Sequence, residues 1–233
     1  MAECAVGLSL ESSSPRAFFT IMPTLLSVLV VSLCFSTVAR AQGFQIWNEE
    51  DITAVFGRSS VTVNLVDRIV PRLANPQFLA AGLMTDVRLP AHTVLSVGYL
   101  VVDLPQRQPS VVRVPLVALS GAVRIRRLTL ADRNRVEQLV GLGSSPVRYR
   151  NRLSLDWSPG IPNPPHVFAD QEVFFITSES GWNQNRVRIG SGWAMRPTLM
   201  LDVFYLQQNV RGRARGQVLG TTLKVALAEH QRE

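Results

Sequence analysis

Short segments in which apolar and polar residues alternate recur from residue 44 to residue 227. Glycine, proline, asparagine and serine separate them, which is typical of strands joined by turns. The eleven segments are 44–56, 60–70, 77–88, 92–103, 110–125, 127–138, 147–157, 167–177, 182–195, 198–209 and 216–227. Each is at least as long as the ~9–11 residues that a tilted strand needs to cross a bilayer. The pattern therefore predicts an all-β fold.

The alternation in residues 147–157 indicates two chemically distinct faces. The even positions carry arginine, serine and aspartate, whereas the odd positions carry mainly leucine, valine and aromatic residues. A soluble sandwich or a lipocalin-like barrel would alternate in the same way. Two features favour a membrane-spanning barrel instead. The polar faces are rich in arginine and glycine rather than lysine and glutamate, and aromatic residues typical of membrane interfaces lie near segment ends, at Trp157, Trp182, Trp193 and Tyr205.

The expected connections add a second indication. They are tight near 57–59, 89–91, 126 and 196–197, and longer near 71–76, 104–109, 139–146 and 210–215. Transmembrane barrels alternate short periplasmic turns with longer outer loops in this way. The proline-rich link Ser158–His166 breaks the alternation. We therefore predict a single antiparallel up-and-down transmembrane-type β-barrel.

The number of strands stays open at about 10–12. Eleven strands cannot close a ring in which every neighbouring pair is antiparallel. Ten would result if residues 44–56 do not form a full strand, and twelve would result if one long segment is split. No linker interrupts the segments, so residues 42–233 are expected to be one barrel domain with a short polar tail from Ala228.

Residues 1–41 are predicted to be an N-terminal lead and a secretory signal peptide. Leu25 to Phe35 is the longest apolar run, and Ala39 and Ala41 give the small-x-small pattern of a cleavage site before Gln42. The run is too short for a membrane-spanning helix, which needs about 20 residues. Export to the outer membrane is therefore expected, with the periplasm as the alternative.

Both cysteines, Cys4 and Cys34, lie in the segment that cleavage would remove. The mature chain is then expected to hold no disulfide and no thiolate metal site. Translation from Met22 would leave no positive charge before the apolar run, whereas translation from Met1 supplies Arg16. Both start sites stay open.

The amino-acid composition indicates that some charged side chains are partly buried. Hydrophobic residues make up 46% of the chain and charged residues only 18%, which is low for a soluble surface. Of the 24 basic residues, Lys224 is the single lysine. Arginine is preferred where a charge pairs with carboxylates away from water, although a codon bias would give the same excess. The net charge of +7 does not indicate a nucleic-acid partner, because no basic patch is interleaved with aromatic residues.

The candidate site is an ionic ladder on the inner faces of four successive strands. It comprises Arg133, Arg135, Glu137, Arg148, Arg150, Arg152, Asp170, Glu172, Arg186 and Arg188. On the lipid side each arginine would cost about 2–4 kcal/mol at the bilayer midplane, so these faces are expected to point into the lumen. Two interpretations stay open. The ladder either plugs and rigidifies a narrow barrel, or lines a path that favours anions, as rings of arginine do.

An enzymatic site is not expected, although an outer-membrane hydrolase or acyltransferase stays an alternative. The mature histidines fall in a tight turn, in the proline-rich link and in the tail, at His92, His166 and His230. A serine–histidine pair of His166 with Ser178 or Ser180 is the nearest approach to a catalytic site. We predict no catalytic residue, no cofactor and no metal.

Four short motifs carry a resemblance to a known family. They are the R-x-R-x-E-Q strand within Ala131–Gln138, the R-Y-R-x-R-L strand Arg148–Leu153, the Q-N-R-x-x-x-G strand Gln184–Gly190 and the opening Phe44–Trp47. In this order they resemble the bacterial family called domain of unknown function 2490, over residues 44–227. The resemblance implies an outer-membrane β-barrel-like protein with no assigned activity.

The chain departs from the family pattern in places. Leu139 stands where another arginine is common, and only Arg113 remains of an expected histidine–arginine pair. The last segment ends at Leu227, not at an aromatic residue of the kind that the barrel-assembly machinery reads. The expected partners are outer-membrane lipid, the assembly machinery during biogenesis and an anionic solute. The alternative is a soluble periplasmic barrel or sandwich that binds an anionic or lipidic ligand.

Overall fold

The computed structural model describes residues 44–69, 76–106, 110–142, 144–159, 165–178, 181–212 and 215–227. The predicted signal peptide, its cleavage before Gln42 and the polar tail from Ala228 lie outside these residues. No helix in the described part of the chain is long and apolar enough to cross a membrane.

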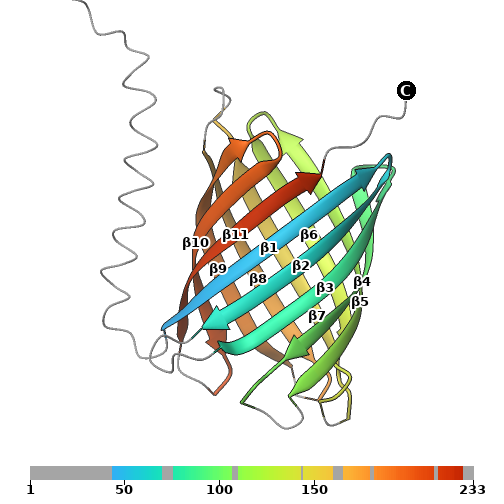
Figure 1. Cartoon of the computed structure of the whole chain (residues 1–233), viewed down its shortest axis with the longest axis vertical. Coiled ribbons are helices and arrows are strands. Elements are labelled where there is room, and N and C mark those ends of the chain that lie inside the picture. The colour runs from blue at the N-terminus through green and yellow to red at the C-terminus, as the bar shows by residue number, and fades with distance from the viewer. Residues whose placement is uncertain are drawn as a thin grey trace, which may run out of the picture.

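The described residues form strands that close into one barrel (Figure 1). The eleven strands are β1 (Phe44–Phe56), β2 (Ser59–Ile69), β3 (Pro76–Leu89), β4 (Thr93–Asp103), β5 (Val111–Ile125), β6 (Leu128–Gln138), β7 (Val147–Trp157), β8 (His166–Ile176), β9 (Trp182–Arg196), β10 (Leu199–Val210) and β11 (Gly216–Leu227). Each agrees with its predicted segment to within one residue at either end. The prediction of an all-β barrel is confirmed.

A parallel pair closes the barrel. Consecutive strands pair antiparallel, but β1 and β11 run side by side in the same direction, from Phe44 opposite Gln217 to Ala54 opposite Leu227. Eleven strands lie within the predicted range of about 10–12. The expectation that closure needs an even number was wrong, because it assumed that every neighbouring pair is antiparallel. With an odd number, β1 begins at one rim of the barrel and β11 ends at the other (Figure 1).

The two rims differ in the length of their connections. One rim, here called the short-turn rim, carries the turns at 57–58, 90–92, 126–127 and 197–198 together with the longer link at 158–165. The other rim carries the connections at 70–75, 104–110, 139–146, 177–181 and 211–215. The alternation in length and its interruption after β7 agree with the sequence pattern.

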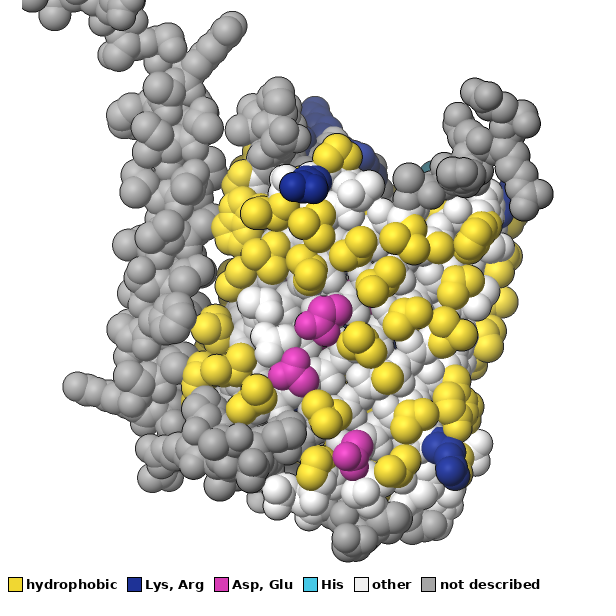
Figure 2. Space-filling view, viewed as in Figure 1, with side chains coloured by type: hydrophobic (Ala, Val, Ile, Leu, Met, Phe, Trp, Pro, Cys, Tyr) yellow, Lys and Arg dark blue, Asp and Glu magenta, His cyan; other side chains and the backbone are white. Residues whose placement is uncertain are grey.

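The two faces of the barrel differ in chemistry. Hydrophobic side chains cover much of the outer wall (Figure 2), and Leu83, Val97 and Leu119 are 52%, 56% and 50% exposed. Charged side chains are buried inside, where Glu137 is 0% and Glu172 is 5% exposed. The period of two places alternate residues of each strand on opposite faces, which produces this division.

Aromatic rings inside the barrel occupy space left by glycines. Phe204 of β10 lies opposite Gly220 of β11 and opposite Gly190 of β9. A Cβ atom at Gly220 would overlap the Phe204 ring, and one at Gly190 would overlap the Phe168 ring and the Cβ of Phe204. The glycines in β9 and β11 thus allow large side chains to lie flat against the inner wall.

Candidate functional site

The lumen contains a cavity of about 1120 Å³, lined by side chains of strands β1 to β10. All ten residues of the predicted ladder line it. They come from the inner faces of β6, β7, β8 and β9, which are neighbours in the barrel. The structure therefore brings them together along one wall, as two carboxylate-centred clusters, one separate ion pair and Arg133 beside them.

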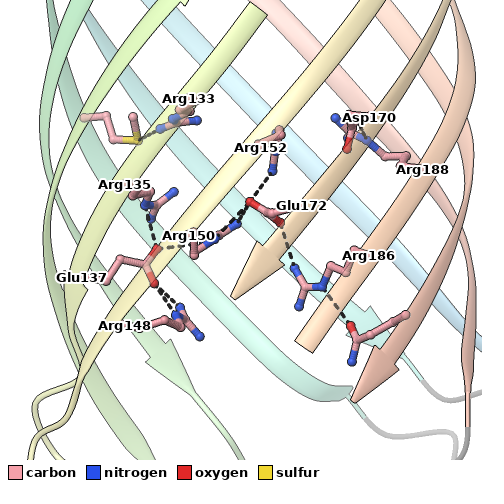
Figure 3. Close-up of polar contacts among 12 residues, drawn as sticks. Arg133, Arg135, Glu137, Arg148, Arg150, Arg152, Asp170, Glu172, Arg186 and Arg188 are labelled. Carbon is pink, nitrogen blue, oxygen red and sulfur yellow. Dashed lines mark hydrogen bonds and ion pairs between the residues drawn. The ribbon is translucent and has the colours of Figure 1, made fainter. Parts of the chain in front are cut away.

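Glu137 is the centre of the first cluster. Its Oε1 lies 2.7 Å from Arg135 Nε and 2.9 Å from Arg150 Nη1, and its Oε2 pairs with Arg148 (Figure 3). The carboxylate is fully buried, and burial of a charge is costly unless opposite charges surround it. Three guanidinium groups meet that condition for Glu137.

Glu172 is the centre of the second cluster. Arg150 Nη2 lies 2.7 Å and Arg152 Nη2 lies 3.3 Å from its Oε1. Arg186 Nη1 lies 3.6 Å from its Oε2, on the side facing β9 (Figure 3). Because Arg150 contacts both carboxylates, the two clusters form one network, here called the arginine network: Arg135, Glu137, Arg148, Arg150, Arg152, Glu172 and Arg186.

Strand register determines which groups meet. Arg135 lies opposite Arg150 across β6 and β7, and Arg133 lies opposite Arg152. Like charges directly opposite each other destabilise a sheet. Arg152 lies opposite Glu172 on its other side, and this carboxylate lowers the repulsion. The network nevertheless holds five arginines and only two carboxylates, so it carries a net positive charge.

The remaining ladder residues lie beside the network. Arg188 Nε donates to Asp170 Oδ2 at 2.6 Å, and these residues are opposite each other across β8 and β9. Arg133 approaches Met84 Sδ at 3.9 Å, and its buried Nε has no hydrogen-bond partner in the described structure. Asp170 and Arg188 therefore balance each other, whereas Arg133 has no carboxylate partner among the described residues.

Arg68 of β2 is a lumenal cation that the sequence reasoning missed. Its Cζ lies 3.7 Å from the ring centre of Trp47 and 3.9 Å from that of Phe78. Its buried Nε has no hydrogen-bond partner among the described residues. The even positions of residues 60–70 include Asn64 as well as Arg68. The alternation of side chains between the two faces of this strand therefore indicated that Arg68 points inward.

Aromatic rings also contact the arginine network. Phe174 lies 4.6 Å from Arg186 Cζ and 4.9 Å from Arg150 Cζ, measured to the ring centre. Trp47 lies 5.1 Å from Arg186 Cζ. Cation–π contacts of this kind strengthen when water is excluded. They hold the guanidinium groups in place without neutralising their charge.

Carboxylates line the part of the cavity that lies away from the arginine network. Glu49 and Asp51 of β1 and Asp86 of β3 also line the lumen. These residues lie on strands across the barrel from β6 to β9. The cavity is therefore polarised, with the excess of arginine on the wall formed by β6 to β9.

The structure corrects the expectation for His166, which was assigned to the proline-rich link. His166 is the first residue of β8, because the strand begins one residue before the predicted segment. Its Nε2 lies 3.6 Å from Asp156 Oδ2 and 3.7 Å from Asp202 Oδ1, and Asp202 also pairs with Lys224 at 2.6 Å. Sequence reasoning missed this cluster because its members come from four separate strands.

The structure does not bring His166 and Ser178 together. Ser178 follows the end of β8 whereas His166 begins it, so the two residues lie at opposite ends of the strand. Ser180 lies outside the described residues. Across the described ranges, no group of three histidine, cysteine, aspartate or glutamate side chains is placed to hold a metal ion.

The fold and the lumen define a class of protein: an eleven-stranded β-barrel with an apolar outer wall and an arginine network inside. A family model described as "Protein of unknown function (DUF2490)" matches residues 44–218. The chain belongs to this family, and the resemblance stated from its motifs is confirmed. A comparison with curated proteins finds no match.

Proposed function

We propose that this protein is an outer-membrane β-barrel whose lumen favours anionic solutes. The proposal has two parts, insertion in a membrane and the preference of the lumen for anions. A different observation supports each part.

The exposure of large apolar side chains around the outer wall carries the proposal of membrane insertion. On a monomeric soluble protein a contiguous apolar patch rarely exceeds a few hundred Å². In a bilayer the same surface is favourable, and a closed ring of strands leaves no unpaired backbone edge in hydrocarbon. A barrel with this outer wall is therefore suited to lipid.

Polar groups on the outer wall of β6 and β7 bond to one another. Asp132 accepts hydrogen bonds from Asn134 at 2.7 Å and from Asn151 at 2.6 Å. The hydroxyl of Tyr149 donates to Asn134. In lipid, polar groups must be satisfied within the protein, and this network does so.

Acidic side chains also interrupt the apolar outer wall, over β1 to β4 (Figure 2). Glu50, Asp67 and Asp103 border a shallow outer groove, and Asn48 donates to Asp67 at 3.1 Å. An isolated carboxylate loses its charge when it is moved into an apolar medium. Membrane insertion therefore requires these groups to be neutral or shielded. They favour the second candidate, a soluble periplasmic barrel that binds an anionic or lipidic ligand.

The preference for anions rests on arginines that no carboxylate neutralises. A purely structural role, in which ion pairs brace a narrow barrel, accounts for Arg150 and Glu172. It does not account for Arg68 and Arg133, whose Nε atoms are buried without a hydrogen-bond partner among the described residues. Rings of arginine select anions, and orphaned guanidinium donors are complementary to an anion.

Trp47 provides a test, because it lies inside the barrel against Arg68 and Arg186. The outer tryptophans Trp157, Trp182 and Trp193 are replaced by phenylalanine in the full chain, which is reconstituted in phosphatidylcholine nanodiscs. Quenching of Trp47 fluorescence is then measured with iodide and with caesium.

We expect iodide to quench Trp47 more strongly than caesium does. Arg68→Gln should reduce this difference, whereas Arg124→Gln, at an exposed position near the short-turn rim, should leave it unchanged. Equal quenching by both ions, or quenching by neither, would exclude an anion-favouring lumen.

A further inference from the structure

The lumen has an apolar wall beside the arginine network. This apolar wall consists of Ala80, Val102, Val112, Val114 and Leu139, all buried and in contact as one cluster. These residues lie on the inner faces of β3, β4 and β5 and just after β6, and they line the same cavity as the arginines. The function proposed above, which concerns anions in general, does not explain an apolar wall.

Arginines border the apolar wall on both sides. On one side Leu139 follows Glu137 by two residues, so both side chains lie on the inner face and the apolar wall adjoins the network. On the other side Phe78 packs against the apolar wall and also carries the guanidinium group of Arg68 at 3.9 Å. A chain lying on this wall would thus have a positive charge within reach at either side.

The combination selects among ligand chemistries. An inorganic anion would match the arginines but would make no use of the apolar side chains that line the same cavity. A neutral lipid would cover the apolar wall but would leave Arg68 and Arg133 without a partner. An anion with an alkyl chain satisfies both surfaces. The cavity, at about 1120 Å³, is slightly larger than the roughly 300–1,000 Å³ usual for sites of small organic ligands, so it has room for an alkyl chain.

We infer that the ligand of the lumen is an amphipathic anion with one alkyl chain, such as a long-chain carboxylate, an alkyl phosphate or an alkyl sulfate. The alkyl chain lies on the apolar wall, and the head group accepts hydrogen bonds from Arg68 and from the neighbouring arginines. This inference rests on the proposed function, since it identifies the class of anion that the same cavity takes. A free fatty acid and a fragment of a membrane lipid share this chemistry.

The variant that keeps Trp47 as its one tryptophan, here called the single-tryptophan chain, allows binding of this ligand to be measured by fluorescence quenching. Carboxylates of six to twelve carbons that carry a terminal bromine quench tryptophan and are titrated into the nanodiscs. Saturable quenching of Trp47 is expected, with an affinity that rises roughly three- to fourfold for each added methylene group buried. Alkyl trimethylammonium ions with the same brominated chains should give no saturable quenching.

Two matched double variants distinguish the contribution of the apolar wall to binding from that of the outer wall. Val102→Thr with Val114→Thr keeps the shape of the cavity wall but adds hydroxyls, and should flatten the dependence on chain length. Val101→Thr with Val117→Thr makes the same changes on the outer wall, where these valines are 42% and 44% exposed, and should not alter it. If the inner variant does not assemble, the chain-length series on the single-tryptophan chain still decides the question.

The outcomes distinguish the two proposals. An affinity that rises with chain length in the single-tryptophan chain and not in the inner variant supports an amphipathic anion. If iodide reaches Trp47 in preference to caesium while affinity is independent of chain length, the inference is overturned and the anion-favouring lumen stands. If alkyl phosphates of equal length bind more tightly than carboxylates, a phosphorylated lipid fragment is the favoured source. Absence of quenching by iodide and by every brominated chain overturns both proposals.

Discussion

Arg150 donates two hydrogen bonds to one oxygen of Glu172, from Nε at 3.1 Å and from Nη2 at 2.7 Å. Its third donor, Nη1, reaches Glu137 at 2.9 Å. A single side chain of β7 therefore links a carboxylate on β6 to a carboxylate on β8. The planar fork of arginine makes this arrangement possible, whereas lysine offers one point charge.

Replacing Arg150 by leucine should destabilise the barrel strongly. Both buried carboxylates would lose their shared partner, and removal of one member of a buried ion pair costs about 3–5 kcal/mol. The measurement is the temperature at which the folded band is lost on a gel run in mild detergent. Arg150→Lys should give an intermediate loss, and Arg124→Leu, at an exposed position, should have little effect. An unchanged profile for Arg150→Leu would count against the network as a stabilising element.

Replacing Leu155 by arginine should block insertion. Leu155 lies on the outer wall of β7 and is 41% exposed, so the new charge would face hydrocarbon. Such a charge costs about 2–4 kcal/mol at the midplane and much less near an interface. Phe56→Arg, at the end of β1 on the short-turn rim, is the matched control. The readout is the amount of protein in the outer-membrane fraction, and normal amounts of Leu155→Arg would mean that this face does not contact lipid.

Replacing Glu50 by leucine tests the outer carboxylates. In a bilayer the substitution removes a group that must be neutral or shielded, so the variant should assemble at least as well as the parent chain. In an aqueous compartment it would enlarge an apolar patch and promote aggregation. Light scattering of the purified protein together with its yield in membranes separates these results. Loss of assembled barrel with Glu50→Leu would show that the charge itself is needed.

The space at Gly220 is filled by Phe204 from the neighbouring strand. A Cβ at position 220 would overlap the ring, so Gly220→Ala should destabilise the barrel by about 1–3 kcal/mol, as overpacking does. Phe204→Leu in the same chain should recover part of the loss. Thermal unfolding of the two single variants and the double variant measures the coupling. Additive effects would mean that the two positions do not compete for space.

The sequence predicts the strands of this barrel well because the period of two is a local signal. Alternation alone predicts a strand over residues 147–157, and β7 spans the same residues. The strand pair that closes the barrel could not be predicted from this local pattern. Pairing of β1 with β11 joins segments more than 150 residues apart, and alternation says nothing about the direction of such a pair.

The candidate site was likewise predictable in part, from local alternation but not from contacts between strands. Parity indicated which residues share a face, and the structure places Arg148, Arg150 and Arg152 on the cavity wall. Parity does not give the register between strands, so it could not tell that Arg150 contacts both Glu137 and Glu172. Arg68 was missed for a related reason: its contacts are aromatic rings on two other strands, not a carboxylate visible as part of a motif.

The central claim is that the barrel is inserted in a membrane, and cell fractionation tests it most directly. The expressed full chain is separated into outer-membrane and osmotic-shock fractions, and each is run on a gel with and without heating. We predict that the protein is in the outer-membrane fraction and that its mobility changes on heating, because a closed barrel resists detergent until it is unfolded. Release by osmotic shock without a mobility shift would contradict the account and favour a soluble binding protein.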